Sequence, residues 1–397
     1  MTDQRKQIGV GDIRLSSNEK KYLEKVIASN RLSYGPFTKD FEKRFANEHG
    51  CKYAIFLNSG TSALLVALAA LKEVHKWNDG DEVIVPSATF IATSNIILQL
   101  NLKPIFVDSD ADTYNIDASK IEQKITDKTR AIIPVHLFGM ACDMDPILAL
   151  ADKHNLKIVE DSCETMFAEY KGKSVGSLGD VGCFSTYIAH FLVTGVGGIC
   201  TTNNPNLAVI IRSAVNHGRD SIYLSIDDDK GKTKEELSEV IDKRFSFVRM
   251  GYSFRATELE AAIGLGQLDQ KDEIIKARRE NAQYYSENLF GLTDVLQLPH
   301  TPNDRDHNFM MYPIVMKNET KTEITNFLEN ASIETRDLPT VVNQPFYKDM
   351  YGEILSDYPV TKKMVESGFY IGSHQYLTEE EKAYVVGKFY EYFNRKH

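Results

Sequence analysis

Cysteines and long apolar runs are scarce in this sequence, and each shortage excludes a class of protein. No two of the five cysteines form a Cys-x-x-Cys pair: Cys51, Cys142, Cys163, Cys183 and Cys200. Such scattered thiols argue against a disulfide scaffold, a zinc site or an iron cluster, and they favour a cytoplasmic protein with no metal. The longest clean apolar run, Ala63 to Leu71, is too short to span a bilayer. The segment from Met1 to Lys20 lacks the apolar core of a signal peptide.

The net charge and the length of the chain further restrict its possible partners and its number of domains. The net charge of -10 gives no electrostatic reason to expect a nucleic acid or an anionic membrane as partner. Hydrophobic residues make up 42% of the chain and charged residues 26%, which is ordinary globular usage. A length of 397 residues is enough for two domains.

Short β-branched runs alternate with helical patterns over residues 50–200. The strand-like runs are Tyr53–Leu57, Glu82–Val85, Pro104–Val107, Ala131–Val135 and Lys157–Glu160. Helical patterns lie between them, as at Ser62 to Val74 and Pro146 to His154. This alternation predicts an α/β fold with a mostly parallel sheet that is covered on both faces, and ligands bind beyond the carboxyl ends of such strands.

The pattern changes after Gly198. Asp220 to Lys243 is rich in charge and predicts an exposed excursion with a short helix. Thr257 to Leu289 predicts one long helix that links two domains. The strand-like run Met310–Met316 and later helical patterns predict a smaller α+β domain. We therefore place a large domain at residues 1–256, and the linking helix and small domain at 257–397.

Two motifs at the ends of predicted strands suggest ligand contacts. Asn58-Ser-Gly-Thr-Ser-Ala63 opens a helix, where backbone amides and hydroxyl groups can bind a phosphate, although Ser-Gly-Thr is also a common helix cap. Asp161 ends another strand and can pair with a protonated pyridine nitrogen, or can simply cap the next turn. Phe90 and Ser185 carry no signal alone, because an isolated Phe beside a strand is usually core.

In their order along the chain, these motifs resemble the DegT/DnrJ/EryC1/StrS family of sugar aminotransferases and dehydratases. The matching segments are Tyr34-Gly-Pro-Phe37, Asn58–Ser62, Ile133–Gly139, Glu160-Asp161, Tyr170–Asp180, Asn216-His-Gly-Arg219 and Gly251–Arg255. The resemblance implies an aspartate-aminotransferase-like fold (pyridoxal-phosphate fold type I), with a seven-stranded sheet in the large domain. It also implies a pyridoxal 5'-phosphate or pyridoxamine 5'-phosphate cofactor, a nucleotide-linked 4-keto-6-deoxy sugar as substrate, and a homodimer with a shared active site.

The resemblance also assigns roles to residues. Those near the cofactor phosphate are Gly60, Thr61, Ser62 and Ser185. Those at the cofactor ring are Phe90 over its face, Asp161 at its nitrogen, and Glu164 near its face or hydroxyl. Those on the substrate side are His217, Arg219, Arg255 and Arg336, the last for an anionic group of the amino donor or the nucleotide.

Three positions depart from the family pattern. His190 stands at the position of the lysine that holds the cofactor aldehyde, and no lysine occurs from Ser174 to Asp229. Val196 replaces the usual acidic residue before paired glycines. Ser253 replaces an asparagine that reaches the partner subunit's cofactor phosphate, so this contact stays open.

An imidazole keeps one of the two tasks of that lysine. It can move a proton near neutral pH, but only a primary amine can bond covalently to the aldehyde. The resemblance offers a precedent in sugar 3-dehydratases such as the GDP-4-keto-6-deoxy-mannose branch, which carry histidine here. The run Glu160–Glu164 and Gly372-Ser-His-Gln375 also resemble that branch. We therefore expect 3-dehydration with release of ammonia, in 3,6-dideoxy sugar and O-antigen lipopolysaccharide synthesis, with glutamate as amino donor.

Two other functions remain open. The first is amino transfer from glutamate to a nucleotide sugar, through a relocated or dispensable amine. The second is a noncatalytic, cofactor-binding protein in which the lysine has been lost by decay, because a histidine on an apolar turn is often only a satisfied core residue.

Overall fold

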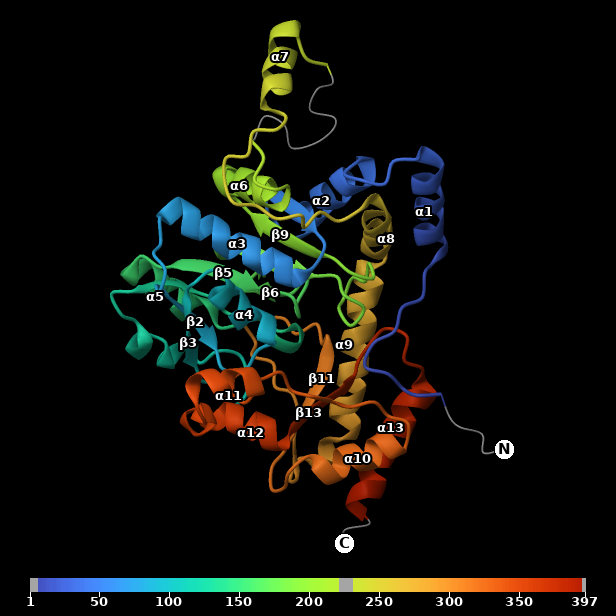
Figure 1. Ribbon diagram of the computed structural model, residues 1–397. Coiled ribbons are helices and arrows are strands. Elements are labelled where there is room, and N and C mark those ends of the chain that lie inside the picture. The colour runs from blue at the N-terminus through green and yellow to red at the C-terminus, as the bar shows by residue number, and fades with distance from the viewer. Residues whose placement is uncertain (1–5, 221–230, 395–397) are drawn as a thin grey trace.

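The computed structural model describes residues 6–220 and 231–394 (Figure 1). Within them, a seven-stranded sheet and a four-stranded sheet organise the chain, and a two-stranded hairpin pairs β6 (Glu169–Tyr170) with β7 (Lys173–Ser174). The α/β architecture predicted from the sequence is therefore confirmed.

The seven-stranded sheet has the order β1-β9-β8-β5-β4-β2-β3. Its strands are β1 (Tyr53–Leu57), β2 (Glu82–Pro86), β3 (Lys103–Val107), β4 (Thr129–Ile132), β5 (Lys157–Asp161), β8 (Val181–Ser185) and β9 (Gly198–Thr202). Neighbouring strands from β3 to β8 pair in parallel, whereas β9 runs antiparallel to β8 and β1. The carboxyl ends of the parallel strands therefore meet at one edge of the sheet.

Helices cover both faces of this sheet because its strands are apolar on both sides. On β1, Ile55 and Leu57 pack with the helices of one face, whereas Ala54 and Phe56 pack with those of the other. The first face carries α3 (Gly60–His75), α4 (Ile91–Gln99) and α6 (Pro205–Val215). The opposite face carries α2 (Pro36–Glu48), α5 (Met144–His154) and α8 (Glu258–Leu268), with α1 (Ser17–Ser29) packed on α8.

The four-stranded sheet belongs to the C-terminal part of the chain. Its order is β10 (Leu296–Gln297), β11 (Met311–Met316), β13 (Gly368–Gly372) and β12 (Arg336–Asp337). Its core is shared with α9 (Lys271–Asn288), α10 (Thr322–Asn330) and α13 (Glu379–Asn394). Ile8 from the N-terminal segment joins this core and pairs in parallel with Ile333. The domain boundary at residue 257 stays a prediction.

Shorter elements complete the described chain. Near the β3 edge, Tyr347 packs on Phe106. The remaining helices are α7 (Lys234–Lys243), α11 (Pro345–Tyr351) and α12 (Pro359–Ser367). The 3-10 turns are η1 (Ala118–Lys120), η2 (Glu122–Lys124), η3 (Leu137–Gly139), η4 (Phe290–Leu292) and η5 (Ile354–Asp357).

The predicted single helix from Thr257 to Leu289 is wrong, because the chain forms α8 and α9 with a break at Asp269-Gln270. Side chains stabilise this break. The Gln270 amide donates to the Gly266 carbonyl at 3.1 Å, and Arg44 donates to the Asp269 carboxylate at 2.8 Å. The helix expected in the excursion is α7, which stands away from the sheets in Figure 1. Residues 221–230 of that excursion lie outside the described chain.

Candidate active site

A cavity of about 710 Å³ lies where the carboxyl ends of the parallel strands face the four-stranded sheet. The large-domain residues that line it include Ser59, Gly60, Thr61, Thr89, Phe90, Thr93, Asp161, Cys163, Glu164, Ser185, Tyr187 and His190. The C-terminal residues that line it include Met310, Met311, Lys321, Arg336, Asp337, Asn343 and Tyr370. Eight of the thirteen residues predicted for the site therefore line one cavity: Gly60, Thr61, Phe90, Asp161, Glu164, Ser185, His190 and Arg336.

The N-terminus of α3 forms one wall of the cavity. Ser59 caps the helix, since its hydroxyl oxygen accepts the Ser62 amide hydrogen at 3.1 Å. A Cβ atom on Gly60 would lie 2.7 Å from Cβ of Ser185 and 2.8 Å from Sγ of Cys163, so only glycine lets α3 approach the end of β8. The helix N-terminus and the hydroxyls of Thr61 and Ser185 make an anion site. Ser62 does not line the cavity, and its hydroxyl is hydrogen-bonded to that of Ser59.

Asp161 is a buried carboxylate at the end of β5. One oxygen accepts the Thr93 hydroxyl hydrogen at 2.7 Å, and the other accepts the Cys163 amide at 3.1 Å. Because Thr93 donates to Asp161, the Thr89 hydroxyl donates to Thr93 in turn, at 2.8 Å. These donors are neutral, and burial raises the pKa of Asp161. The carboxylate therefore suits a ligand that brings a positive charge or a proton.

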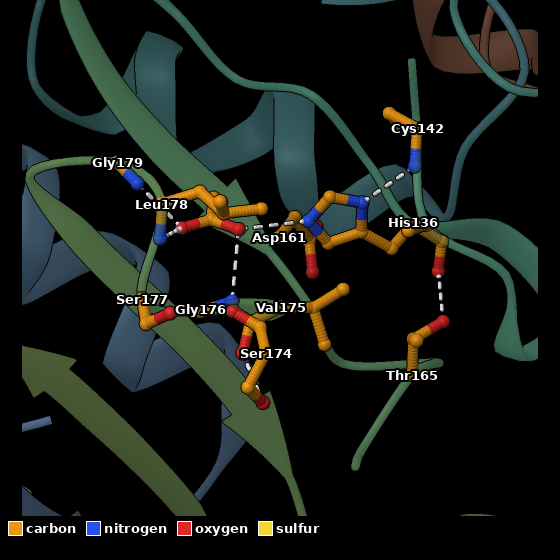
Figure 2. Close-up of polar contacts among 12 residues, drawn as sticks. His136, Cys142, Asp161, Thr165, Ser174, Val175, Gly176, Ser177, Leu178 and Gly179 are labelled. Carbon is orange, nitrogen blue, oxygen red and sulfur yellow. Dashed lines mark hydrogen bonds and ion pairs between the residues drawn. The ribbon is translucent and has the colours of Figure 1, made fainter. Parts of the chain in front are cut away.

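Glu160, the residue before Asp161 on β5, is hydrogen-bonded to His136 in a buried polar network. Figure 2 shows His136 and the backbone groups of this network. The Cys142 amide donates to Nδ1 of His136 at 3.0 Å, so Nε2 carries the proton and donates to Glu160 at 3.1 Å. Glu160 also accepts three backbone amides, from Gly176, Leu178 and Gly179. The His136 amide donates to the Asp161 carbonyl at 3.0 Å. This network fixes the ends of β4 and β5 and thereby the position of Asp161.

Glu164 lies in the cavity wall after β5. Its carboxylate accepts the Phe138 amide at 3.1 Å, and Phe138 adopts a left-handed backbone with φ of 61° to present that amide. Burial raises the pKa of Glu164 to about 7, and the nearby Asp161 carboxylate acts in the same direction. Glu164 can therefore hold or release a proton near neutral pH.

His190 ends the turn that follows β8 and lines the cavity. Its Nδ1 lies 3.2 Å from the Tyr187 carbonyl oxygen, which can only accept, so Nδ1 carries the proton. Nε2 is then left with a free lone pair. Burial, together with the positive charge of Arg278, lowers the pKa of His190 to about 4. The imidazole is therefore neutral at pH 7, and Nε2 is able to accept a proton.

The other predicted substrate residues, and Ser253 of the predicted cofactor site, lie outside this cavity. Arg255 donates to Nε2 of His217 at 3.2 Å and to the Ser253 hydroxyl at 3.1 Å, and all three side chains are exposed. Arg219 packs over the rings of Phe245 and Phe247. Four of the thirteen predicted residues, namely His217, Arg219, Arg255 and Ser253, are thus not brought to the cavity of the same chain.

The C-terminal wall contains charged residues that the sequence did not single out. Lys321 lies just before α10, and its Nζ is 2.8 Å from the Asp337 carboxylate on β12. Arg336, which was predicted, pairs with Glu334 beside it. No motif marks Lys321, since it comes to the cavity through the core that α10 shares with β13 and through its pair with Asp337.

Other kinds of site find no support within the described residues. None of the helices in residues 6–220 and 231–394 is long and apolar enough to cross a membrane. The same part of the chain holds no cluster of three His, Cys, Asp or Glu side chains with the geometry for a metal ion.

Comparison with known proteins places these observations in a family. Residues 14–390 match the model of the DegT/DnrJ/EryC1/StrS aminotransferase family. The chain is 38% identical over 334 residues to the GDP-perosamine synthase of Caulobacter vibrioides, covering 83% of this chain and 84% of that one. It is 30% identical over 370 residues to the GDP-4-keto-6-deoxy-D-mannose 3-dehydratase of Yersinia pseudotuberculosis, covering 90% and 92%.

A solved structure agrees with the fold. The E. coli GDP-4-keto-6-deoxy-D-mannose-3-dehydratase with bound hydrated pyridoxal phosphate superposes on this chain with a TM-score of 0.85. The two sequences are 26% identical, and the match covers 96% of this chain and 98% of that one. Similar relatives thus include both a synthase and a dehydratase.

Proposed function

The chain belongs to the DegT/DnrJ/EryC1/StrS aminotransferase family, and on that premise we propose that it removes the 3-hydroxyl group of a nucleotide-linked 4-keto-6-deoxy sugar. The reaction is a dehydration that also releases ammonia, and its product is a 3,6-dideoxy sugar of the kind used in lipopolysaccharide. One observation carries this proposal. The site offers a neutral imidazole at His190, and residues 174–229 contain no lysine.

The cavity fits pyridoxal phosphate or pyridoxamine phosphate. The phosphate would bind at the N-terminus of α3, with the hydroxyls of Thr61 and Ser185. The ring nitrogen would face Asp161, whose neutral donors leave its charge uncompensated, and Phe90 would cover the ring. When bound in its aminated form, the cofactor supplies an amine that condenses with the keto group and a ring that withdraws electrons.

The residues of this chain then determine the reaction. His190 accepts a proton at Nε2, because Nδ1 is committed to the Tyr187 carbonyl. Glu164, whose pKa burial raises to about 7, is placed in the same wall to exchange a second proton. No amine of the His190 segment can bond covalently to the cofactor, so water releases the nitrogen as ammonia instead of passing it to the product.

The exposed group of His217, Ser253 and Arg255 is explained if the active enzyme is a homodimer. Each subunit would then supply these side chains to the cavity of its partner, while Arg336 and Lys321 serve the cavity of their own chain. Glutamate, with two carboxylates for such cations, is the proposed amino donor that restores the aminated cofactor.

The test is product analysis. Protein, cofactor, glutamate and a nucleotide 4-keto-6-deoxy-hexose should yield 2-oxoglutarate, ammonia and a 3-deoxy sugar, identified by mass spectrometry. A 4-amino sugar formed without ammonia would contradict the dehydratase. No turnover across GDP-, CDP-, UDP- and dTDP-linked sugars would contradict both catalytic functions.

Amino transfer is the second candidate, because Lys321 brings a primary amine to the cavity wall. Borohydride reduction of the holoenzyme followed by peptide mass spectrometry separates the two functions. We expect no covalent cofactor on the chain. A reduced adduct on Lys321 would favour the aminotransferase, and the Lys321→Arg variant should then lose the adduct.

A further inference from the structure

Arg278 on α9 is a buried positive charge without a carboxylate partner among the described residues. Its side chain is 2% exposed, and the guanidinium carbon lies 5.0 Å from the centre of the Phe191 ring. Burial lowers its pKa to about 10, so it stays protonated at neutral pH. An unpaired buried charge lowers the stability of the fold. We therefore expect Arg278 to have a role other than stabilising the fold.

Its hydrogen bonds give that reason, because they join segments that line the cavity. One guanidinium nitrogen donates to the Met310 carbonyl at 2.8 Å, and the other donates to the His190 carbonyl at 3.3 Å. The Arg278 carbonyl accepts the Ser373 hydroxyl hydrogen at 3.2 Å. One turn later on α9, Asn281 donates to the His374 carbonyl at 2.9 Å. Arg278 thus ties the His190 turn to the start of β11 and to the loop after β13.

We propose that Arg278 is a positioning residue for His190, which it fixes through the carbonyl oxygen while placing a permanent positive charge close to the imidazole. The positive charge of Arg278 acts on two histidines. Burial and Arg278 lower the pKa of His190 to about 4 and the pKa of His374 to about 4. The inference rests on the proposed role of His190 as base, because a base must be unprotonated before it acts.

Other titratable groups surround His190. On its own turn Tyr187 packs edge-on against the imidazole. The titratable side chains that line the same cavity from other elements are Asp161, Cys163, Glu164, Lys321, Arg336, Asp337 and Tyr370. Arg278 differs from Lys321 and Arg336, whose carboxylate partners offset their charges.

The test measures the protonation of single histidines and needs no turnover. Deuterium exchange at the imidazole C2 carbon, resolved by peptide mass spectrometry over about pH 4–8, gives a midpoint for each histidine. In the wild-type protein we expect His190 and His374 to titrate below about pH 5.5, well under the ordinary 6.5. A His190 exchange midpoint at or above the ordinary 6.5 overturns the proposal, even if every variant fails to fold.

Arg278→Met should raise both midpoints by roughly 1 pH unit, because the buried charge is gone. Arg279→Met is the matched control, since Arg279 is exposed on the same helix and its charge acts on His307 instead. That control should leave His190 and His374 unchanged. Unchanged midpoints in a folded Arg278→Met protein, checked by circular dichroism, overturn the proposal.

Arg278→Lys separates position from charge. It keeps the charge and should keep both midpoints, but a lysine cannot bond to the His190 and Met310 carbonyls as a rigid fork. We expect kcat for 3-deoxy sugar formation to fall at least about tenfold with little change in KM. A wild-type kcat overturns the positioning role. If the wild-type protein has no dehydratase activity, the proposed function fails, while the exchange midpoints still decide the effect of the charge.

Discussion

Replacing His190 by Asn isolates the proposed proton-transfer role, because the new side chain keeps one contact of the imidazole and removes the other. Nδ1–H of His190 donates to the Tyr187 carbonyl at 3.2 Å, and an asparagine amide can donate in its place. The lone pair at Nε2 has no counterpart in the variant. We therefore expect the turn and the cofactor cradle to persist while the base is lost.

The expected loss follows from the role of a positioned base. Such a base contributes about 10²–10⁴-fold to the rate, which corresponds to roughly 2.7–5.4 kcal/mol of activation free energy. The assay follows 3-deoxy sugar and ammonia in a single turnover with pyridoxamine phosphate, so that regeneration by glutamate does not limit the rate. Cofactor affinity, measured from its absorbance, should stay within about threefold, since asparagine replaces no contact of the phosphate or ring nitrogen.

His300→Asn is the matched control, since it removes an exposed imidazole away from the cavity and should leave the rate unaltered. A wild-type rate in the His190→Asn protein would refute the reasoning and assign the proton to another group, first of all Glu164. Loss of cofactor binding together with activity would instead mean that His190 acts on cofactor affinity.

Three further substitutions test the residues that are proposed to hold the cofactor. Gly60→Ala should lower thermal stability by roughly 1–3 kcal/mol, measured by calorimetry, because its Cβ would meet Ser185 at 2.7 Å; an unchanged Tm would show that α3 moves freely. Asp161→Asn should raise the Tm of the cofactor-free protein at pH 7, because burial raises the pKa of this carboxyl, and should weaken cofactor binding in titrations; a lower Tm would contradict the burial cost. Glu164 has a folded pKa of about 7, above its unfolded value, so the stability it contributes is complete below about pH 4.3 and is lost as pH rises to 7. Urea titrations should show that this decline is smaller in Glu164→Gln by on the order of 3 kcal/mol, and an equal decline in the two proteins would contradict it.

The sequence predicted the α/β fold and five of the seven strands of the large sheet, because local patterns determine them. Each predicted strand is a short, mainly apolar run, and Ser59-Gly60-Thr61 has the chemistry of a helix cap. The strands β8 and β9 contain glycine, serine or threonine and were not predicted. The same patterns failed at Thr257 to Leu289, where apolar periodicity continues through a break. At that break Arg44 bonds to Asp269 from a segment 225 residues away. Contacts of this kind leave no local signal.

The residues of the candidate site also fall into two groups, those that local sequence patterns indicate and those that depend on distant packing. Asp161 and Ser185 end strands and Gly60 begins the helix after one, so the sheet itself brings them together; the motifs around Gly60 and Asp161 suggested ligand contacts, whereas Ser185 was predicted only through the family resemblance. Lys321 lines the cavity, and Arg278 bonds to the His190 carbonyl behind it, only because the C-terminal part of the chain folds against the large sheet, which no motif encodes. The tautomer of His190 could not be predicted from the sequence either, because it depends on the Tyr187 carbonyl in the folded turn.

Whole-chain similarity is a weak guide to the reaction in such a protein. The 38% identity to a synthase and the 30% identity to a dehydratase average over more than 330 positions, whereas the proposed base is a single residue. In the proposed mechanism, the choice between passing nitrogen to the sugar and releasing it depends on whether an amine reaches the cofactor. At position 190 the chain places an imidazole whose burial and neighbouring Arg278 keep it neutral, a state that suits a base. Only Lys321 can oppose that conclusion from the described wall of the cavity, which makes its reaction with the cofactor the decisive measurement.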